Sequence, residues 1–175
     1  GEVWLARHRR LAGKQVAIKV LHVDRQLPQE AVARFKREAE IAARLEHPNI
    51  VPVHDFNTLP TGQPYLVMEY LKGQSLAARA KGQALPLEQV TAIMRQVGAA
   101  LQAAHRAGVV HRDLKPENIF LVPTALGDQV KVLDFGISKL SEAESLTLTG
   151  QHFGTAYYLA PEQAAGKDAS SPRID

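Results

Sequence analysis

The sequence contains no cysteine among its 175 residues. Disulfide bonds, thiolate metal sites and a cysteine nucleophile are therefore excluded. The seven histidines lack the spacing of zinc ligands. No G-x-x-x-x-G-K-[ST] sequence occurs either, which argues against a P-loop nucleotide site. A chain without cysteine fits a reducing compartment, so we expect a cytoplasmic location.

Long apolar runs are also missing. No stretch approaches the length of a membrane-spanning helix, and the first residues lack the pattern of a signal peptide. We therefore expect no membrane segment in this chain, while a segment outside it could still anchor the parent protein. Internal repeats and low-complexity runs are absent as well.

Neither sign of charge dominates the composition. The chain has 21 lysines and arginines against 18 acidic residues, a net charge of +3. The basic residues are scattered apart from Arg7, Arg9 and Arg10, which we interpret as a solvated strand end, so nucleic acid is not an expected partner. The content of 45% hydrophobic and 22% charged residues predicts a folded globular protein rather than disorder.

The residues suited to chemistry are concentrated in the segment 111–136. Asp113, Lys115 and Asn118 come at fixed offsets, and Asp134 follows in an Asp-Phe-Gly sequence. Carboxylate and amide oxygens suit a hard cation. A lysine can neutralise charge on a transferring phosphoryl group, and a free carboxylate can orient a hydroxyl nucleophile. Asp-Phe-Gly alone is typical of a polar turn, but the whole set indicates a phosphate-and-metal site.

This set closely resembles the signature of protein kinases. The resemblance rests on His-Arg-Asp-Leu-Lys-x-x-Asn from His111, Asp-Phe-Gly at 134–136, Val-Ala-Ile-Lys at 16–19 and Ala-Pro-Glu at 160–162. Lys115 and the Gly-Thr before Ala-Pro-Glu favour a serine/threonine kinase of the bacterial, eukaryotic-like type. The resemblance implies ATP-dependent phosphorylation of serine and threonine hydroxyls on protein substrates, with ATP and Mg²⁺ as cofactors.

The resemblance also implies an α+β, bilobal protein-kinase-like fold. A small antiparallel β-sheet lobe with one helix is expected at residues 1–71, and a mainly helical lobe at 72–175. Gly1-Glu2-Val3 resembles the end of a glycine-rich loop, so the first strand and most of that loop are expected to be missing. The second lobe is expected to be partial too, ending after Ala-Pro-Glu. Such a fragment could be inactive alone.

Hydrophobic periodicity and turn residues predict the elements. Strands are predicted at 2–7, 14–21, 50–56, 64–70, 119–122 and 130–133, and helices at 28–46, 75–81 and 86–107. The apolar stripe of the last helix comprises Val90, Ile93, Met94, Val97, Leu101 and Ala104. We assign that helix to the core, with His105 near its end as a packing or capping residue rather than a ligand.

Glu38 lies within the apolar stripe of the 28–46 helix, between Phe35 and Ile41. A carboxylate in such a stripe needs a partner, and Lys19 is the natural counter-charge. The kinase resemblance predicts the same pair. Periodicity and motif therefore point independently to Glu38.

By resemblance, the nucleotide site draws on both lobes. Lys19, held by Glu38, would orient the α- and β-phosphates of ATP. The other residues implied here are Val3 over the adenine ring, Ala17 beside Lys19, Met68 behind the ring, Glu69 and Leu71 at its edge through their backbone, and Phe120 below it. For Met68, packing in the core is an alternative interpretation.

The resemblance implies roles for the central residues too. Asp113 would accept the proton of the substrate hydroxyl, and Lys115 would stabilise the γ-phosphate. Asn118 and Asp134 would hold Mg²⁺. His111 is assigned to packing rather than to proton transfer.

By the same resemblance, residues 134–162 form an activation segment. Thr147 and Thr149 stand where related bacterial kinases carry autophosphorylated threonines, and Arg112 would pair with the phosphate. A homodimer for autophosphorylation is a possible partner arrangement. Asp175 falls where kinases have an anchoring aspartate.

Two other functions compete with a protein kinase. The first is a nucleotide-binding, pseudokinase-like scaffold module, which intact Lys19, Asp113, Asn118 and Asp134 argue against. The second is phosphoryl transfer to a small molecule. The threonine-bearing segment before Ala-Pro-Glu favours a protein substrate.

Overall fold

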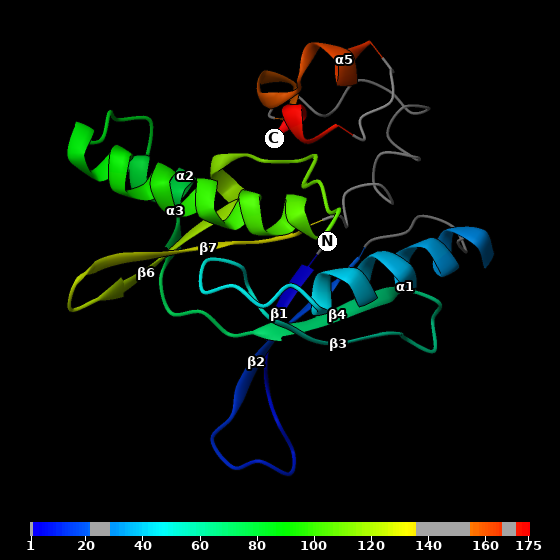
Figure 1. Cartoon of the computed structure of the whole chain (residues 1–175). Helices are drawn as coiled ribbons and strands as arrows, with labels where there is room; N and C mark the ends of the chain where they lie inside the picture. Colours follow the sequence, from blue (N-terminus) through cyan, green and yellow to red (C-terminus); the bar gives the residue numbers. More distant parts are fainter. Residues whose placement is uncertain (1, 22–28, 136–154, 166–170) are drawn as a thin grey trace. The chain divides into compact units, whose positions relative to one another are not determined.

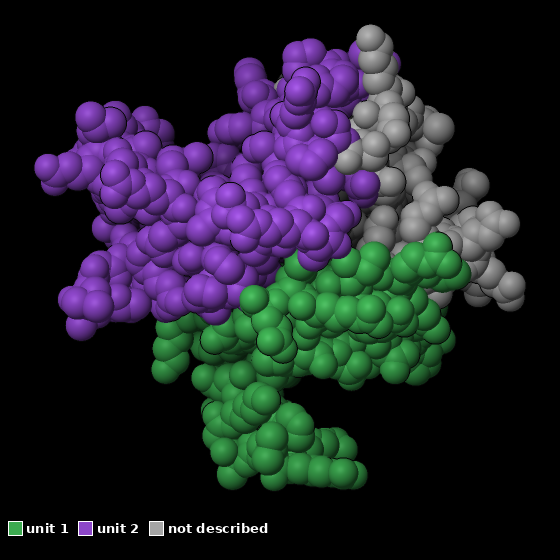
Figure 2. Space-filling model, in the orientation of Figure 1, with its two compact units in different colours: residues 1–46, 51–72 green, residues 47–50, 73–175 purple. Residues whose placement is uncertain are grey.

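The computed structural model describes residues 2–21, 29–135, 155–165 and 171–175. The chain divides into two compact units, shown in green and purple in Figure 2. Unit 1 comprises residues 1–46 and 51–72, and unit 2 comprises residues 47–50 and 73–175. The short segment 47–50 therefore belongs to unit 2, although the sequence on both sides of it belongs to unit 1.

Unit 1 is built on a four-stranded antiparallel sheet with the order β1-β2-β4-β3 (Figure 1). The strands are β1 (Glu2–Arg7), β2 (Gln15–Val20), β3 (Val53–Thr58) and β4 (Pro64–Glu69). The run of β-branched residues in β2 favours an extended backbone. The predicted strands at 2–7, 14–21 and 64–70 are confirmed within one residue at each end.

The predicted strand at 50–56 is wrong at its beginning, because β3 starts only at Val53. Pro52 has no backbone N–H to donate to a sheet ladder. Its carbonyl instead accepts a hydrogen bond from Glu69 N at 3.1 Å. Ile50 forms an isolated parallel bridge with Val132 of unit 2.

Helix α1 (Gln29–Ala43) packs against β3 within unit 1. Its buried residues include Ala39 and Ala42, and Leu45 is buried just beyond its end. Ile41 is 38% exposed, so the expectation that it lies in the buried stripe is wrong. Among the described side chains of α1, the small Ala39 and Ala42 are therefore buried, and the longer Ile41 is not.

Unit 2 contains a three-stranded sheet, β5-β6-β7, and the long helix α3, which packs against β7. Short helical turns connect and follow these elements. In chain order, the strands, helices and turns of unit 2 are β5 (Gln74–Ser75), α2 (Leu76–Ala80), α3 (Leu87–Arg106), η1 (Pro116–Asn118), β6 (Ile119–Thr124), β7 (Gly127–Val132), η2 (Thr155–Tyr158), α5 (Pro161–Ala164) and η3 (Pro172–Ile174).

The buried face of α3 is formed by Ile93, Val97, Ala100 and Ala104, at spacings of three and four residues. The predicted stripe is therefore right at Ile93, Val97 and Ala104, but it is wrong at Val90 and Met94. Met94 is 50% exposed, and Val90 is also exposed. Both lie on the flank of the face that contacts β7. Of the helices in the described residues, none combines the length and the apolarity needed to span a membrane.

A side-chain network explains why residues 47–50 belong to unit 2. Asn49 Nδ2 donates to Gln96 Oε1 and to Val130 O, both at 2.9 Å. Gln96 Oε1 also accepts from Val130 N, and Gln96 Nε2 donates to Asp128 O, again at 2.9 Å. Val132 N donates to Asn49 O at 2.8 Å. These bonds join the segment to both α3 and β7.

Candidate active site

Asp113, Lys115 and Asn118 form one hydrogen-bonded cluster in unit 2. Lys115 Nζ lies 2.8 Å from Asp113 Oδ2 and 3.0 Å from Oδ1. Asn118 Nδ2 donates to the backbone oxygen of Asp113 at 2.8 Å and to Oδ2 at 3.1 Å. The turn η1 brings these residues together, because its first residue, Pro116, has a backbone fixed for a helical start. The predicted catalytic residues therefore lie in direct contact.

Asn118 and Asp134 lie at the same end of the β6–β7 hairpin. Asn118 directly precedes β6, Asp134 comes two residues after the end of β7, and Ile119 is paired with Val132. The carbonyl of Asn118 accepts a hydrogen bond from Leu133 N at 2.9 Å. The strand pairing thus brings the two predicted metal ligands close together, although 15 residues separate them in sequence.

The donor chemistry of these two residues fits Mg²⁺. Asn118 uses its Nδ2 group for Asp113, so its Oδ1 is the atom that a cation would contact. Asp134 supplies carboxylate oxygens. Mg²⁺ is usually bound by one or two carboxylates together with phosphate oxygens and water. An amide and a carboxylate are therefore a suitable protein contribution.

His111 is completely buried and connects the backbone of Asp113 to that of Leu133, the residue before Asp134. Its Nε2 donates to Leu133 O at 2.7 Å, and its Nδ1 accepts from Asp113 N at 3.3 Å. This pattern requires the neutral ring. Burial lowers the pKa of His111, and this effect exceeds the opposing influence of the Leu133 bond and of nearby carboxylates. The ring also contacts Phe135 edge-on at 4.8 Å between centroids, which confirms the predicted packing role.

Two residues of this region have left-handed backbone without being glycine. The φ angles are 70° at Arg112 and 63° at Asp134. Such conformations cost on the order of 1–3 kcal/mol each and persist where the surroundings fix them. They occur directly before Asp113 and at the predicted metal ligand. In the described part of the chain, two of the three non-glycine residues with positive φ therefore lie at the candidate site, and the third, Lys81, caps the end of α2.

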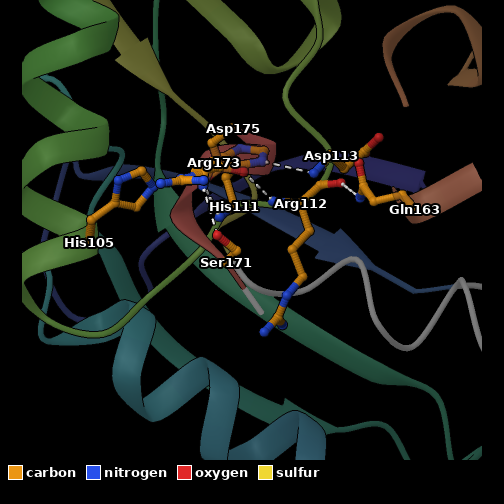
Figure 3. Close-up of polar contacts among 8 residues, drawn as sticks. All are labelled: His105, His111, Arg112, Asp113, Gln163, Ser171, Arg173 and Asp175. Carbon is orange, nitrogen blue, oxygen red and sulfur yellow. Dashed lines mark hydrogen bonds and ion pairs between the residues drawn. The ribbon is translucent and has the colours of Figure 1, made fainter. Parts of the chain in front are cut away.

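Side chains from the end of the chain hold the backbone of this loop (Figure 3). Asp175 has a fully buried side chain that accepts from His111 N and Arg112 N, both at 2.7 Å, and contacts His105 Nε2 at 2.8 Å. Gln163 Nε2 donates to Arg112 O at 2.8 Å. Asp175 was expected as an anchor by resemblance, but the contact with His105 and the role of Gln163 were not predicted.

The predicted nucleotide residues of unit 1 share one face of its sheet. Val3 is paired with Lys19, and Ala17 is paired with Met68, in antiparallel register. Directly paired residues point to the same face, as do Ala17 and Lys19 two positions apart. Met68 is buried, whereas Val3 is 63% exposed. The amide nitrogen of Glu69 is engaged with Pro52 O, as described above.

The other predicted site residues are placed as follows. Phe120 is half-buried on β6, where it is paired with Ser75, and Leu71 is half-buried after β4. The Arg112 side chain points away from Asp175 and Gln163 in Figure 3. The Glu38 side chain, Thr147 and Thr149 lie outside the described residues.

Comparison with known proteins shows the class to which this chain belongs. The model of the protein kinase domain family matches residues 1–175, and the chain is therefore a member of the protein kinase family. Membership implies the use of ATP and a divalent metal ion in general. The predicted protein-kinase fold is confirmed.

The relatives are bacterial serine/threonine kinases. The chain is 46% identical over 175 residues to serine/threonine-protein kinase PknA of Mycobacterium tuberculosis, covering 97% of this chain and 40% of PknA. It is 46% identical over 169 residues to Pkn1 of Myxococcus xanthus, covering 95% of this chain and 24% of Pkn1. It thus spans less than half the length of these relatives.

Solved structures give the same assignment. A crystal structure of the PknI kinase domain of Mycobacterium tuberculosis, a double mutant, matches with a TM-score of 0.78 and 34% identity. The match covers 100% of this chain and 62% of that domain. The expected resemblance to bacterial, eukaryotic-like serine/threonine kinases is confirmed.

Proposed function

We propose that this chain is the catalytic portion of a protein kinase that transfers the γ-phosphoryl group of ATP to serine or threonine hydroxyls of protein substrates. The observation that carries the proposal is the cluster of Asp113, Lys115 and Asn118, joined through Asn118 O and Leu133 N to the residue before Asp134. Phosphoryl transfer depends mainly on positioning and electrostatics, and this cluster supplies both.

Asp113 is the proposed acceptor of the substrate proton. Asn118 and Lys115 hold its carboxylate by hydrogen bonds, which fixes the direction from which a hydroxyl can approach. Lys115 neutralises charge on the γ-phosphate as it is transferred. Asn118 and Asp134 are the proposed protein ligands of Mg²⁺. When bound there, Mg²⁺ would neutralise phosphate charge and orient the leaving group.

The residues of unit 1 are proposed to bind the nucleotide itself. Lys19, held by Glu38, contacts the α- and β-phosphates. Adenine is bound by apolar contacts and by backbone groups at its edge. The proposed apolar contacts are Val3, Ala17, Met68 and Phe120, and the proposed backbone groups are those of Glu69 and Leu71. In these terms, unit 1 corresponds to the first lobe of a kinase and unit 2 to the second.

Regulation by phosphorylation is part of the same proposal. Phosphate on Thr147 or Thr149 would add negative charge that Arg112 can bind, which would order the activation segment. Autophosphorylation would proceed through a homodimer. The cytoplasmic location expected from the lack of cysteine stays a prediction. No observation favours the alternative of a pseudokinase-like scaffold.

The experiment is a phosphotransfer assay with γ-labelled ATP, Mg²⁺ and a generic serine/threonine protein substrate, on the kinase domain in its parent protein. We expect Asp113→Asn to lower the rate by about 10²-fold or more, since general base catalysis typically contributes about 10²–10⁴-fold. Asp55→Asn makes the same chemical change at an exposed position of β3 and serves as the control. Nucleotide binding without transfer would instead support the scaffold.

A further inference from the structure

Arg112 is held at both of its backbone polar groups by side chains from residues 160–175 (Figure 3). Its N–H donates to Asp175 Oδ1 at 2.7 Å, and its carbonyl accepts from Gln163 Nε2 at 2.8 Å. These two bonds fix a residue with a left-handed backbone, φ 70°. The strained conformation is therefore determined from outside the loop that contains it.

The bond from Gln163 acts directly on the peptide plane that leads to Asp113. The carbonyl of Arg112 and the N–H of Asp113 belong to the same planar unit. The carbonyl end is bound by Gln163, and the N–H end donates to His111 Nδ1 at 3.3 Å. Rotation of this plane would break both bonds and move the Asp113 side chain relative to Lys115.

The other end of the Gln163 side chain is also engaged. Its Oε1 accepts from Ala160 N at 3.0 Å, at the start of α5. One half-buried amide group thus donates to the loop before Asp113 and accepts from the Ala-Pro-Glu segment. An amide side chain can do both, whereas a carboxylate accepts but does not donate.

We propose that Gln163 is a positioning residue for Asp113. Its two hydrogen bonds link the position of the segment around Ala160 to the orientation of the peptide plane that precedes Asp113. The proposal rests on the proposed kinase function, and it differs from a simple helix cap in a testable way. A cap requires only the bond to Ala160 N, whereas positioning requires the bond to Arg112 O.

Gln163→Glu separates the two roles, because it keeps the acceptor for Ala160 N and removes the donor to Arg112 O. We expect this variant to lower kcat by about tenfold while KM for ATP changes by less than about twofold, as for loss of a positioning hydrogen bond. Gln102→Glu, on the exposed face of α3, is the matched control and should leave kcat unchanged. Gln163→Met removes both bonds at similar volume and should lower kcat at least as much.

Amide hydrogen exchange on the same proteins supplies a measurement that does not depend on activity. We expect faster exchange at Arg112 and Asp113 in Gln163→Glu and in Gln163→Met, and unchanged exchange in Gln102→Glu. Unchanged exchange at these two amides in Gln163→Glu would overturn the positioning role, even if the wild-type protein is an active kinase. Equal losses of kcat in Gln163→Glu and Gln102→Glu would overturn it as well. An inactive wild-type protein with the expected exchange pattern would contradict the proposed function alone.

Discussion

Lys115 Nζ lies 2.8 Å from Asp113 Oδ2, and both side chains are about one-fifth exposed. The ammonium is thus close enough to the proposed base to contact the transferring phosphoryl group as well. Lys115→Met should lower kcat by about 10²-fold, the cost typical of removing one donor that stabilises transition-state charge. KM for ATP should change little, since other residues are proposed to bind the adenine and the α- and β-phosphates.

The measurement is steady-state kinetics with γ-labelled ATP, and Lys14→Met, at the exposed end of the β1–β2 hairpin, is the control. Unchanged kcat in Lys115→Met would contradict the assigned role. A large rise in KM with normal kcat would contradict it too, because it would indicate ground-state binding only.

Asp175 should be important for stability, because its buried carboxylate accepts from the N–H groups of His111 and Arg112 and contacts His105. Asp175→Ala leaves buried donors without an acceptor, and we expect it to lower the free energy of unfolding by about 3 kcal/mol. Asp175→Asn keeps one acceptor oxygen and should cost less. His105→Ala removes only one of the contacts and is the comparison. Urea denaturation provides the values, and equal stability of Asp175→Ala and wild type would refute the expectation.

His111 should make stability depend on pH. Burial lowers its pKa in the folded protein below the ordinary value of 6.5. When the pH falls below about 6.5, His111 therefore binds a proton in the unfolded chain but stays neutral in the folded protein. The contribution of the neutral His111 ring to stability is complete above that pH and is lost as the pH falls. The free energy of unfolding should then decrease by up to about 1.4 kcal/mol per pH unit.

The substitution His111→Gln provides the test, because an amide side chain can still donate to Leu133 O but does not titrate. Between pH 7.5 and 5, unfolding free energies of His111→Gln should fall less steeply than those of wild type. The other six histidines are common to both proteins, so their effects cancel. Parallel curves would show that the buried ring does not control this dependence.

Gly73 should not tolerate a side chain. A Cβ atom there would collide with the carbonyl oxygen of Leu121 and lie 3.1 Å from the Phe120 ring. Since β5 is paired with β6 at this point, the strand itself would have to move. We expect Gly73→Ala to cost about 1–3 kcal/mol, the range of overpacked sites. Gly98→Ala, in α3 with no neighbour within 4 Å, should stabilise the protein by about 0.5–1 kcal/mol. Thermal denaturation of both variants and of the wild type measures these changes in stability.

Much of the fold was predictable from local signals. The helix expected at 75–81 is confirmed as α2, because Ser75 caps its start and accepts from Ala78 N. Fixed motif spacing also led to Asp113, Lys115 and Asn118, since their contacts lie within the short segment 113–118. These predictions succeed because the interactions concerned join residues close in sequence.

Other features could not be predicted, because they depend on contacts between distant residues. The exposure of Ile41 and Met94 is decided by which flank of a helix meets the sheet, and periodicity defines that flank only within about one residue. Gln163 follows Ala-Pro-Glu in a polar stretch, and no local pattern indicates that it contacts Arg112, 51 residues away. The start of β3 was missed because Ile50 pairs with Val132, which is 82 residues away in sequence.

The four residues 47–50 have a consequence for how this protein can be dissected. These residues belong to unit 2, where Asn49 forms hydrogen bonds with α3 and β7, while the chain on both sides of them belongs to unit 1. The polypeptide therefore passes from one unit to the other three times, at 46/47, 50/51 and 72/73. A single cut at 72/73 would produce a C-terminal piece without Asn49, in which Gln96 and Val130 lose their shared partner. Independent expression of unit 2 therefore requires a grafted tetrapeptide or a circularly rearranged gene rather than a shortened one.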